Sequence, residues 1–150
     1  MVSRLKKILL LVCIILICLV VFLFALDLYI GDRPGTARNV QVNIGVSERF
    51  TQEEIESATE LVISEFRFIN SELTELWYDE ESSNLEIGRS TMDLNMNDTI
   101  ILFSTVVVSE PGGPGFLSPG ILGNLGWVLV RDAQSGEWEL ITSGFSGMHF

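Results

Sequence analysis

The sequence predicts an α+β fold in which a transmembrane helix precedes a domain of one long helix packed on a curved antiparallel sheet of about five strands. Three observations predict it: an uncharged apolar run near the N-terminus, one amphipathic helix with its own start signal, and several strand-like segments around that helix. We divide the chain into a cytoplasmic basic tail, a transmembrane helix, a linker and an extracytoplasmic α+β domain, at residues 1–7, 8–30, 31–39 and 40–150.

The apolar run is long enough to cross a bilayer. Residues 8–26 are 19 residues without a charge or a proline, and the apolar character continues to Ile30. About 20 such residues span the hydrocarbon core of a membrane. Three basic residues precede the run and none follows it directly, which predicts a cytoplasmic N-terminus and a domain outside the cell. A cleaved signal peptide has a shorter apolar core and a small residue at each end of its exit site, so we predict an uncleaved anchor in the cell membrane.

The rest of the chain is strongly acidic and has no cysteine. Residues 31–150 contain six arginines, no lysine and 19 acidic residues, for a formal charge of −13. This charge disfavours nucleic acid and anionic lipid as partners, and it favours solubility, a basic partner or a divalent cation. Both cysteines, Cys13 and Cys18, lie in the apolar run, so the domain has no disulfide and no thiolate nucleophile. We interpret them as apolar filler, with palmitoylation as the alternative.

The amphipathic helix is predicted within residues 50–69. Thr51 and Glu54 have the spacing of a capping box, in which each side chain accepts a hydrogen bond from a backbone N–H that the first turn leaves unpaired. Phe50 and Ile55 flank this box as a hydrophobic staple. One stripe of the helix is apolar and should face a sheet. It consists of Ile55, Ala58, Thr59, Val62, Phe66 and Ile69.

The strand candidates lie on both sides of the helix. They are residues 40–46, 73–78 and 99–109 and a closing hairpin of 127–131 and 137–141. We expect Arg131 to pair across the hairpin with Glu137 or Glu139. The polar residues 79–84 are predicted to form a solvated loop or a helical turn, and residues 110–126, with three prolines and six glycines, to be irregular.

This order of elements resembles the cystatin-like and nuclear-transport-factor (SnoaL-like) superfamily, in which a curved antiparallel sheet wraps around one long helix. Three pieces, FTQEEIESA, LTELWYDEESSN and WVLVRDAQSGEWEL, resemble an uncharacterised family of small membrane-anchored extracytoplasmic proteins of clostridia and related Gram-positive bacteria. The resemblance implies the fold. It implies no particular activity, because the superfamily contains enzymes, binding modules and adaptors.

The residues needed for common catalytic chemistry are scarce. The only histidine, His149, is one residue from the C-terminus, so no serine of the domain has an activating base and no cysteine–histidine cluster can bind zinc. Residues 93–98 place oxygens at the first, third and fifth positions of a calcium loop, but Asp98 stands where glycine is required. We interpret them as a polar turn, and we predict no metal and no cofactor.

The candidate ligand-pocket residues are Trp77, Tyr78, Trp127, Arg131 and Trp138. The simplest interpretation is that the aromatic ones belong to the core and rim of a small sheet. The more specific hypothesis is that some of them, with Arg131, line a concave pocket between sheet and helix for an apolar or aromatic ligand.

The expected function is binding without catalysis. We expect a single-pass membrane protein whose acidic domain binds a protein partner or a small apolar ligand, and not nucleic acid. One alternative is a SnoaL-like hydrolase or isomerase that uses a buried carboxylate such as Glu65 or Glu75. Another alternative is a structural subunit of a membrane complex.

Overall fold

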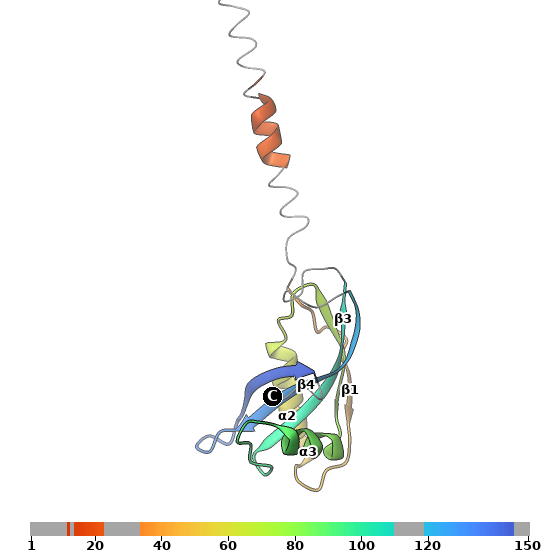
Figure 1. Cartoon of the computed structure of the whole chain (residues 1–150), viewed down its shortest axis with the longest axis vertical. Helices are drawn as coiled ribbons and strands as arrows, with labels where there is room; N and C mark the ends of the chain where they lie inside the picture. Colours follow the sequence, from red (N-terminus) through yellow and green to blue (C-terminus); the bar gives the residue numbers. More distant parts are fainter. Residues whose placement is uncertain (1–11, 13, 23–33, 110–118, 146–150) are drawn as a thin grey trace, which may run out of the picture. The chain divides into compact units, whose positions relative to one another are not determined.

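The computed structural model describes residues 12, 14–22, 34–109 and 119–145, and the chain forms two compact units, Met1–Asp32 and Arg33–Phe150 (Figure 1). In the first unit, residues 12 and 14–22 are helical, and their apolar side chains are exposed, as Leu16 and Phe22 illustrate. Most of the predicted membrane span, 8–30, lies outside the described residues. Within the described residues, no helix is both long enough and apolar enough to span a bilayer.

The second unit confirms the predicted α+β class. In its described residues, five strands form one sheet in the order β1-β2-β3-β4-β5, and two helices interrupt the strands. In chain order the elements are β1 (Gln41–Ile44), α2 (Gln52–Glu65), β2 (Ser71–Tyr78), α3 (Glu80–Arg89), β3 (Thr99–Val108), β4 (Gly120–Arg131) and β5 (Trp138–Phe145).

The sheet is mixed, so the prediction of an antiparallel sheet is wrong at one edge. The strands β2 to β5 pair antiparallel, whereas β1 pairs parallel to β2. The reason is the connection: the chain leaves β1, returns along α2 and enters β2 at the same end of the sheet. A helical crossover of this kind joins parallel neighbours, whereas a tight turn joins antiparallel ones.

The long helix forms as its sequence predicts, but it ends earlier. The side chain of Thr51 accepts a hydrogen bond from the backbone of Glu54, and Glu54 accepts one from the backbone of Thr51, which completes the capping box. The helix ends at Glu65, and Phe66 is extended but still buried. Ile69 therefore lies beyond the helix. One face of the sheet packs on the helix, and we call it the α2 face. Its cluster includes Ile55, Ala58, Val62, Leu76, Leu102, Val106 and Leu129.

The opposite face, here called the α3 face, is covered in part by a second helix, α3, which begins in residues 79–84, predicted to be a solvated loop or a helical turn. Asp79 caps α3 by accepting a hydrogen bond from the backbone N–H of Ser82 at 2.8 Å. Its Ile87 side chain is buried in a small second cluster. That cluster also contains Ile101, Phe103 and Val128, with Trp77 and Leu94 packed against it.

The prediction that residues 110–126 are irregular is wrong in its second part, because β4 begins at Gly120. Its first half pairs with β3, from Val108 opposite Gly120 to Val106 opposite Leu122. A β-bulge follows, with Asn124 in the left-handed region at φ 57°. Asparagine tolerates this conformation, and the bulge lets a glycine-rich strand bend while it keeps its hydrogen bonds.

The described part of the predicted linker, residues 34–39, lies against the domain. Thr36 forms a parallel bridge with Glu72: its N–H donates to the Ser71 carbonyl, and its own carbonyl accepts from Leu73, both at 2.9 Å. A Cβ atom on Gly35 would overlap the Phe68 carbonyl, so glycine permits this close approach. The chain therefore joins the domain before residue 40.

Candidate functional site

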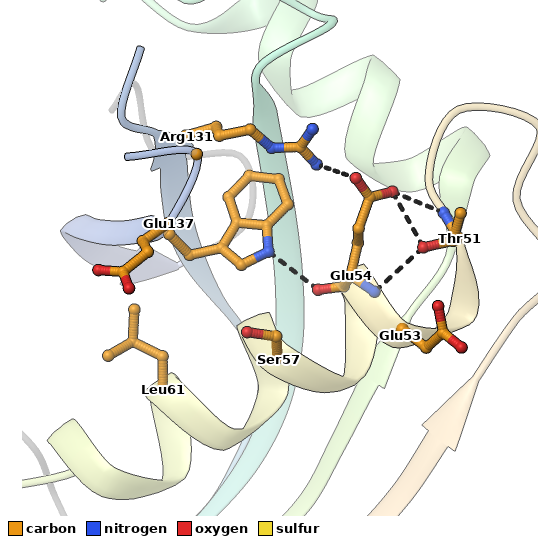
Figure 2. A pocket seen from close by; sticks show the side chains of 9 residues that line it. Thr51, Glu53, Glu54, Ser57, Leu61, Arg131 and Glu137 are labelled. Carbon is orange, nitrogen blue, oxygen red and sulfur yellow. Dashed lines mark hydrogen bonds and ion pairs between the residues drawn. The ribbon is translucent and has the colours of Figure 1, made fainter. Parts of the chain in front are cut away.

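The helix–hairpin hollow, an open depression of about 480 Å³, lies between the first turns of α2 and the turn that joins β4 to β5 (Figure 2). Both walls are set by local sequence: the capping box fixes the start of the helix, and Asp132 and Gly136 close the hairpin turn. The lining residues are Thr51, Glu53, Glu54, Ser57, Leu61, Arg131, Gly136, Glu137 and Trp138.

Glu54 ties the two walls together. One carboxylate oxygen accepts hydrogen bonds from the N–H and the hydroxyl of Thr51, at 2.8 and 3.2 Å. The other oxygen accepts from Arg131 Nη2 at 2.7 Å, and the Glu54 backbone carbonyl accepts from Trp138 Nε1 at 2.9 Å (Figure 2). The helix start and the hairpin are therefore joined by two hydrogen bonds, one to the Glu54 carboxylate and one to its backbone carbonyl.

The partner of Arg131 differs from the prediction. Arg131 lies opposite Trp138 in the strand register, and it pairs with Glu54 of α2 in place of Glu137 or Glu139 of its own hairpin. Its guanidinium carbon lies 4.7 Å from the centre of the Trp138 ring, a cation–π distance. The hairpin therefore contributes an aromatic ring to the surroundings of the guanidinium, and the helix contributes the carboxylate that pairs with it.

Phe50 lies at the centre of an aromatic cluster beside the hollow. Its ring meets Tyr78 and Trp138 edge-on, with centroids 6.4 and 5.5 Å apart. The guanidinium groups of Arg49 and Arg131 lie 4.7 and 5.8 Å from its centroid. Such edge-on rings and ring–cation contacts favour one arrangement of the side chains, so Phe50 helps to hold Arg131 and Trp138, which do line the hollow.

The electrostatics of the site favour the ionised form of Glu54. The hydrogen bond from the Thr51 backbone, followed by the charge of Arg131, lowers the pKa of Glu54 despite its partial desolvation. Across the cluster, burial raises the pKa of the Tyr78 hydroxyl. That hydroxyl donates to Glu80 at 3.4 Å, and hydrogen bonds led by the one from Ser47 lower the pKa of Glu80.

The five predicted pocket residues are divided among three places. Arg131 and Trp138 line the hollow together, and Tyr78 joins them through Phe50. Trp127 is 2% exposed in the core, where its ring N–H donates to Ser104 at 2.8 Å. Trp77 lies on the α3 face, stacked on Phe103 with centroids 6.2 Å apart. The strand alternation separates Trp77 from Tyr78, because neighbouring residues point to opposite faces.

The carboxylates named for the enzyme alternative are not buried together in a cavity. Glu65 is exposed at the end of α2. Glu75 is half-buried on β2, where it accepts hydrogen bonds from the Asn43 amide at 3.1 Å and the Thr105 hydroxyl at 3.4 Å. Glu86 of α3 is buried, with Arg89 at 3.5 Å. None of these three lines the helix–hairpin hollow.

The segment that resembles a calcium loop forms a polar turn. The Asn95 side chain accepts from the backbone N–H of Asn97 at 3.0 Å and donates to the Asp98 carboxylate at 2.9 Å. The first of these contacts uses the Asn95 oxygen, at the third position of the loop. Across the described parts of the chain, no group of three or more histidine, cysteine, aspartate or glutamate side chains is arranged to hold a metal ion.

The places of Glu53, Glu54 and Glu137 in the hollow were not predicted from the sequence, nor was the packing of Phe50 beside it. Phe50 and Glu54 were identified only as parts of the helix start signal. The signal for a second role was present in the sequence, since Glu54 has an acceptor oxygen left over after the capping box is complete. The arginine that uses this oxygen is 77 residues away, and only the folded chain reveals it.

Comparisons with known proteins give no family for this chain. No protein-family model, no curated protein and no solved structure matches it.

Proposed function

We propose that this protein is a single-pass membrane protein whose acidic extracytoplasmic domain binds a partner at the helix–hairpin hollow and catalyses no reaction. The apolar run of residues 8–30 and the basic residues before it support the anchor and its orientation. The exposed apolar side chains of residues 14–22 also support it, because a contiguous apolar surface is unfavourable in water and typical of a membrane contact.

The observation that carries the binding function is the construction of the hollow. Its floor is fixed by the contacts among Glu54, Arg131 and Trp138, while Glu53 and Glu137 on its rim are exposed. A preorganised floor lowers the entropy lost on binding. An exposed acidic rim around an aromatic side chain suits recognition, because tryptophan and arginine are frequent anchors of binding surfaces.

For the fold superfamily we propose cystatin-like or nuclear-transport-factor-like. One long helix on a five-stranded sheet supports this proposal. The parallel pairing of β1 departs from the all-antiparallel sheet that the resemblance implies, and α3 is an addition to it.

The binding function is tested by photo-crosslinking in intact membranes. A benzoylphenylalanine at Ser57, which lines the hollow, should give a discrete adduct after irradiation. The matched control carries the same group at Glu139, an exposed residue of β5 next to Trp138 in the strand and outside the hollow's lining. The same adducts from both positions, or none from Ser57, would contradict a binding role for the hollow.

The orientation is tested separately with Ser135→Cys, which places a thiol in the exposed hairpin turn. A membrane-impermeant maleimide should label this thiol in intact cells. Labelling only after the cells are lysed would place the domain in the cytoplasm.

A further inference from the structure

We infer that the partner is an extended basic segment of another protein, which binds along a groove from the edge of β1 to the helix–hairpin hollow. The inference rests on the proposed binding function and specifies the chemistry of its partner.

The groove consists of three hollows, each of which shares lining residues with the next. One of about 600 Å³ follows the edge of β1, where residues 42–45 and the neighbouring Glu75 and Trp77 line it. A second, of about 360 Å³, shares Ile44 and Gly45 with the first and extends to Thr51. Thr51 also lines the helix–hairpin hollow. A site of this form suits an extended chain better than a compact small molecule.

The edge of β1 has the features of a strand that can accept another strand. It is the end strand of the sheet, and among the described residues it pairs only with β2. Three of its four residues are exposed, Val42 at 39%, and its register with β2 has no bulge. Natural edges are commonly protected by very short length, proline, lysine or bulges, and β1 has only four residues but none of the other three. Without these, an extended peptide can add to the edge through backbone hydrogen bonds.

The charge of the groove selects a basic chain. Glu75 lies at the β1 end, and Glu53 and Glu137 lie at the hollow. Arg131 also lines the groove, but it pairs with Glu54, and Arg49 is not among the lining residues. An acidic peptide would meet uncompensated negative charge, whereas lysine or arginine side chains would be attracted.

The test uses the full-length chain in detergent micelles and isothermal titration with synthetic peptides of alternating valine and lysine. The valine–lysine peptide should bind with a Kd below about 1 mM, and higher salt should weaken it because exposed ion pairs are screened. Two peptides of equal length serve as comparisons. One has glutamate in place of lysine, and the other is N-methylated at alternate residues, so it cannot donate the hydrogen bonds of one strand edge.

Matched protein variants locate the binding site. Glu53→Gln and Glu137→Gln should each raise the Kd for the valine–lysine peptide about threefold, the effect of losing one exposed ion pair. Glu139→Gln removes the same charge from the same hairpin outside the groove and should leave the Kd within about 1.5-fold.

Three results would overturn the inference: no binding of the valine–lysine peptide, equal binding of the glutamate peptide, or equal binding of the N-methylated peptide. An adduct at position 57 together with any of these results would leave the binding function standing and reject the extended basic partner. The absence of both the adduct and peptide binding would reject the two proposals together.

Discussion

The two faces of the sheet are covered by helices that are attached in different ways. On the α2 face the contact is apolar: Ile55, Ala58 and Val62 are at most 1% exposed against the sheet. On the α3 face the helix is short and polar, and Leu85, one of its two large apolar residues, is half exposed. Its attachment depends on polar contacts. The buried Ser83 hydroxyl accepts a hydrogen bond from the Ile101 backbone at 3.0 Å, and Asn84 accepts one from Arg49.

This difference explains why one helix was predicted and the other was not. An apolar stripe at helical spacing can be recognised in the sequence of a single segment. The helix α2 can therefore be predicted without knowing which strands it packs on. A helix held by hydrogen bonds to distant residues has no such stripe. Its stability depends on Ile101 and Arg49, which lie in other parts of the chain.

The largest expected effect compares isoleucines on the two faces. Ile55→Ala on the α2 face should lower the free energy of unfolding by about 2–5 kcal/mol, because a deeply packed side chain leaves a cavity. Ile87→Ala on the α3 face should fall at the low end of that range, because its cluster contains few side chains. Urea denaturation followed by tryptophan fluorescence measures both. Equal losses would contradict the proposed difference between the faces.

A polar contact should matter more on the α3 face. Ser83→Ala leaves the Ile101 N–H buried without its acceptor, which should cost about 1–3 kcal/mol. Ser64→Ala, at an exposed position of α2, is the control and should stay within about 0.5 kcal/mol of the parent. A neutral Ser83→Ala would show that another group or a water replaces the hydroxyl.

Substitutions at the two helix caps should change the free energy of unfolding by a smaller amount, and they test the same difference between the faces. Thr51→Ala and Asp79→Ala remove the N-cap side chains of α2 and α3, and each should cost about 0.5–2 kcal/mol. Hydrogen exchange should separate them. Asp79→Ala should speed exchange throughout α3, whereas Thr51→Ala should affect only the first turn of α2, because the apolar stripe holds the rest. Faster exchange along the whole of α2 would contradict this prediction.

The smallest effect is a dependence on acid pH. Hydrogen bonds from Thr51 lower the pKa of Glu54, and hydrogen bonds from Ser82 lower the pKa of Asp79. A carboxyl with a lowered pKa binds fewer protons in the folded state than in the unfolded state. Its contribution to stability is therefore present above the unfolded pKa and is lost as pH falls through the folded pKa.

Stability should accordingly fall as the pH drops below 4.5, the usual value for glutamate. Glu54→Gln and Asp79→Asn should each make this fall shallower, as measured by thermal unfolding across a pH series. Ser64→Ala, at an exposed position of α2, removes no ionisable group and is the control that should leave the slope unchanged. A slope that Glu54→Gln does not change would show that this carboxylate contributes nothing to the acid sensitivity.

The sequence alone determined the parts of this protein that depend on neighbours along the chain. The capping box of Thr51 and Glu54, the stripe of α2, the apolar strand β3 and the closing hairpin all follow from local periodicity and turn residues. The candidate site was predicted only in part: Arg131 and Trp138 come together in the hollow, while Trp77 and Trp127 do not.

The tertiary structure decided what depends on residues far apart. The parallel pairing of β1, the helix α3, the early start of β4 at Gly120 and the ion pair of Arg131 with Glu54 all join separate segments. The physical reason is that a hydrogen bond or an ion pair needs two partners in one place. A local pattern shows which groups are available, and only the folded chain determines which of them meet.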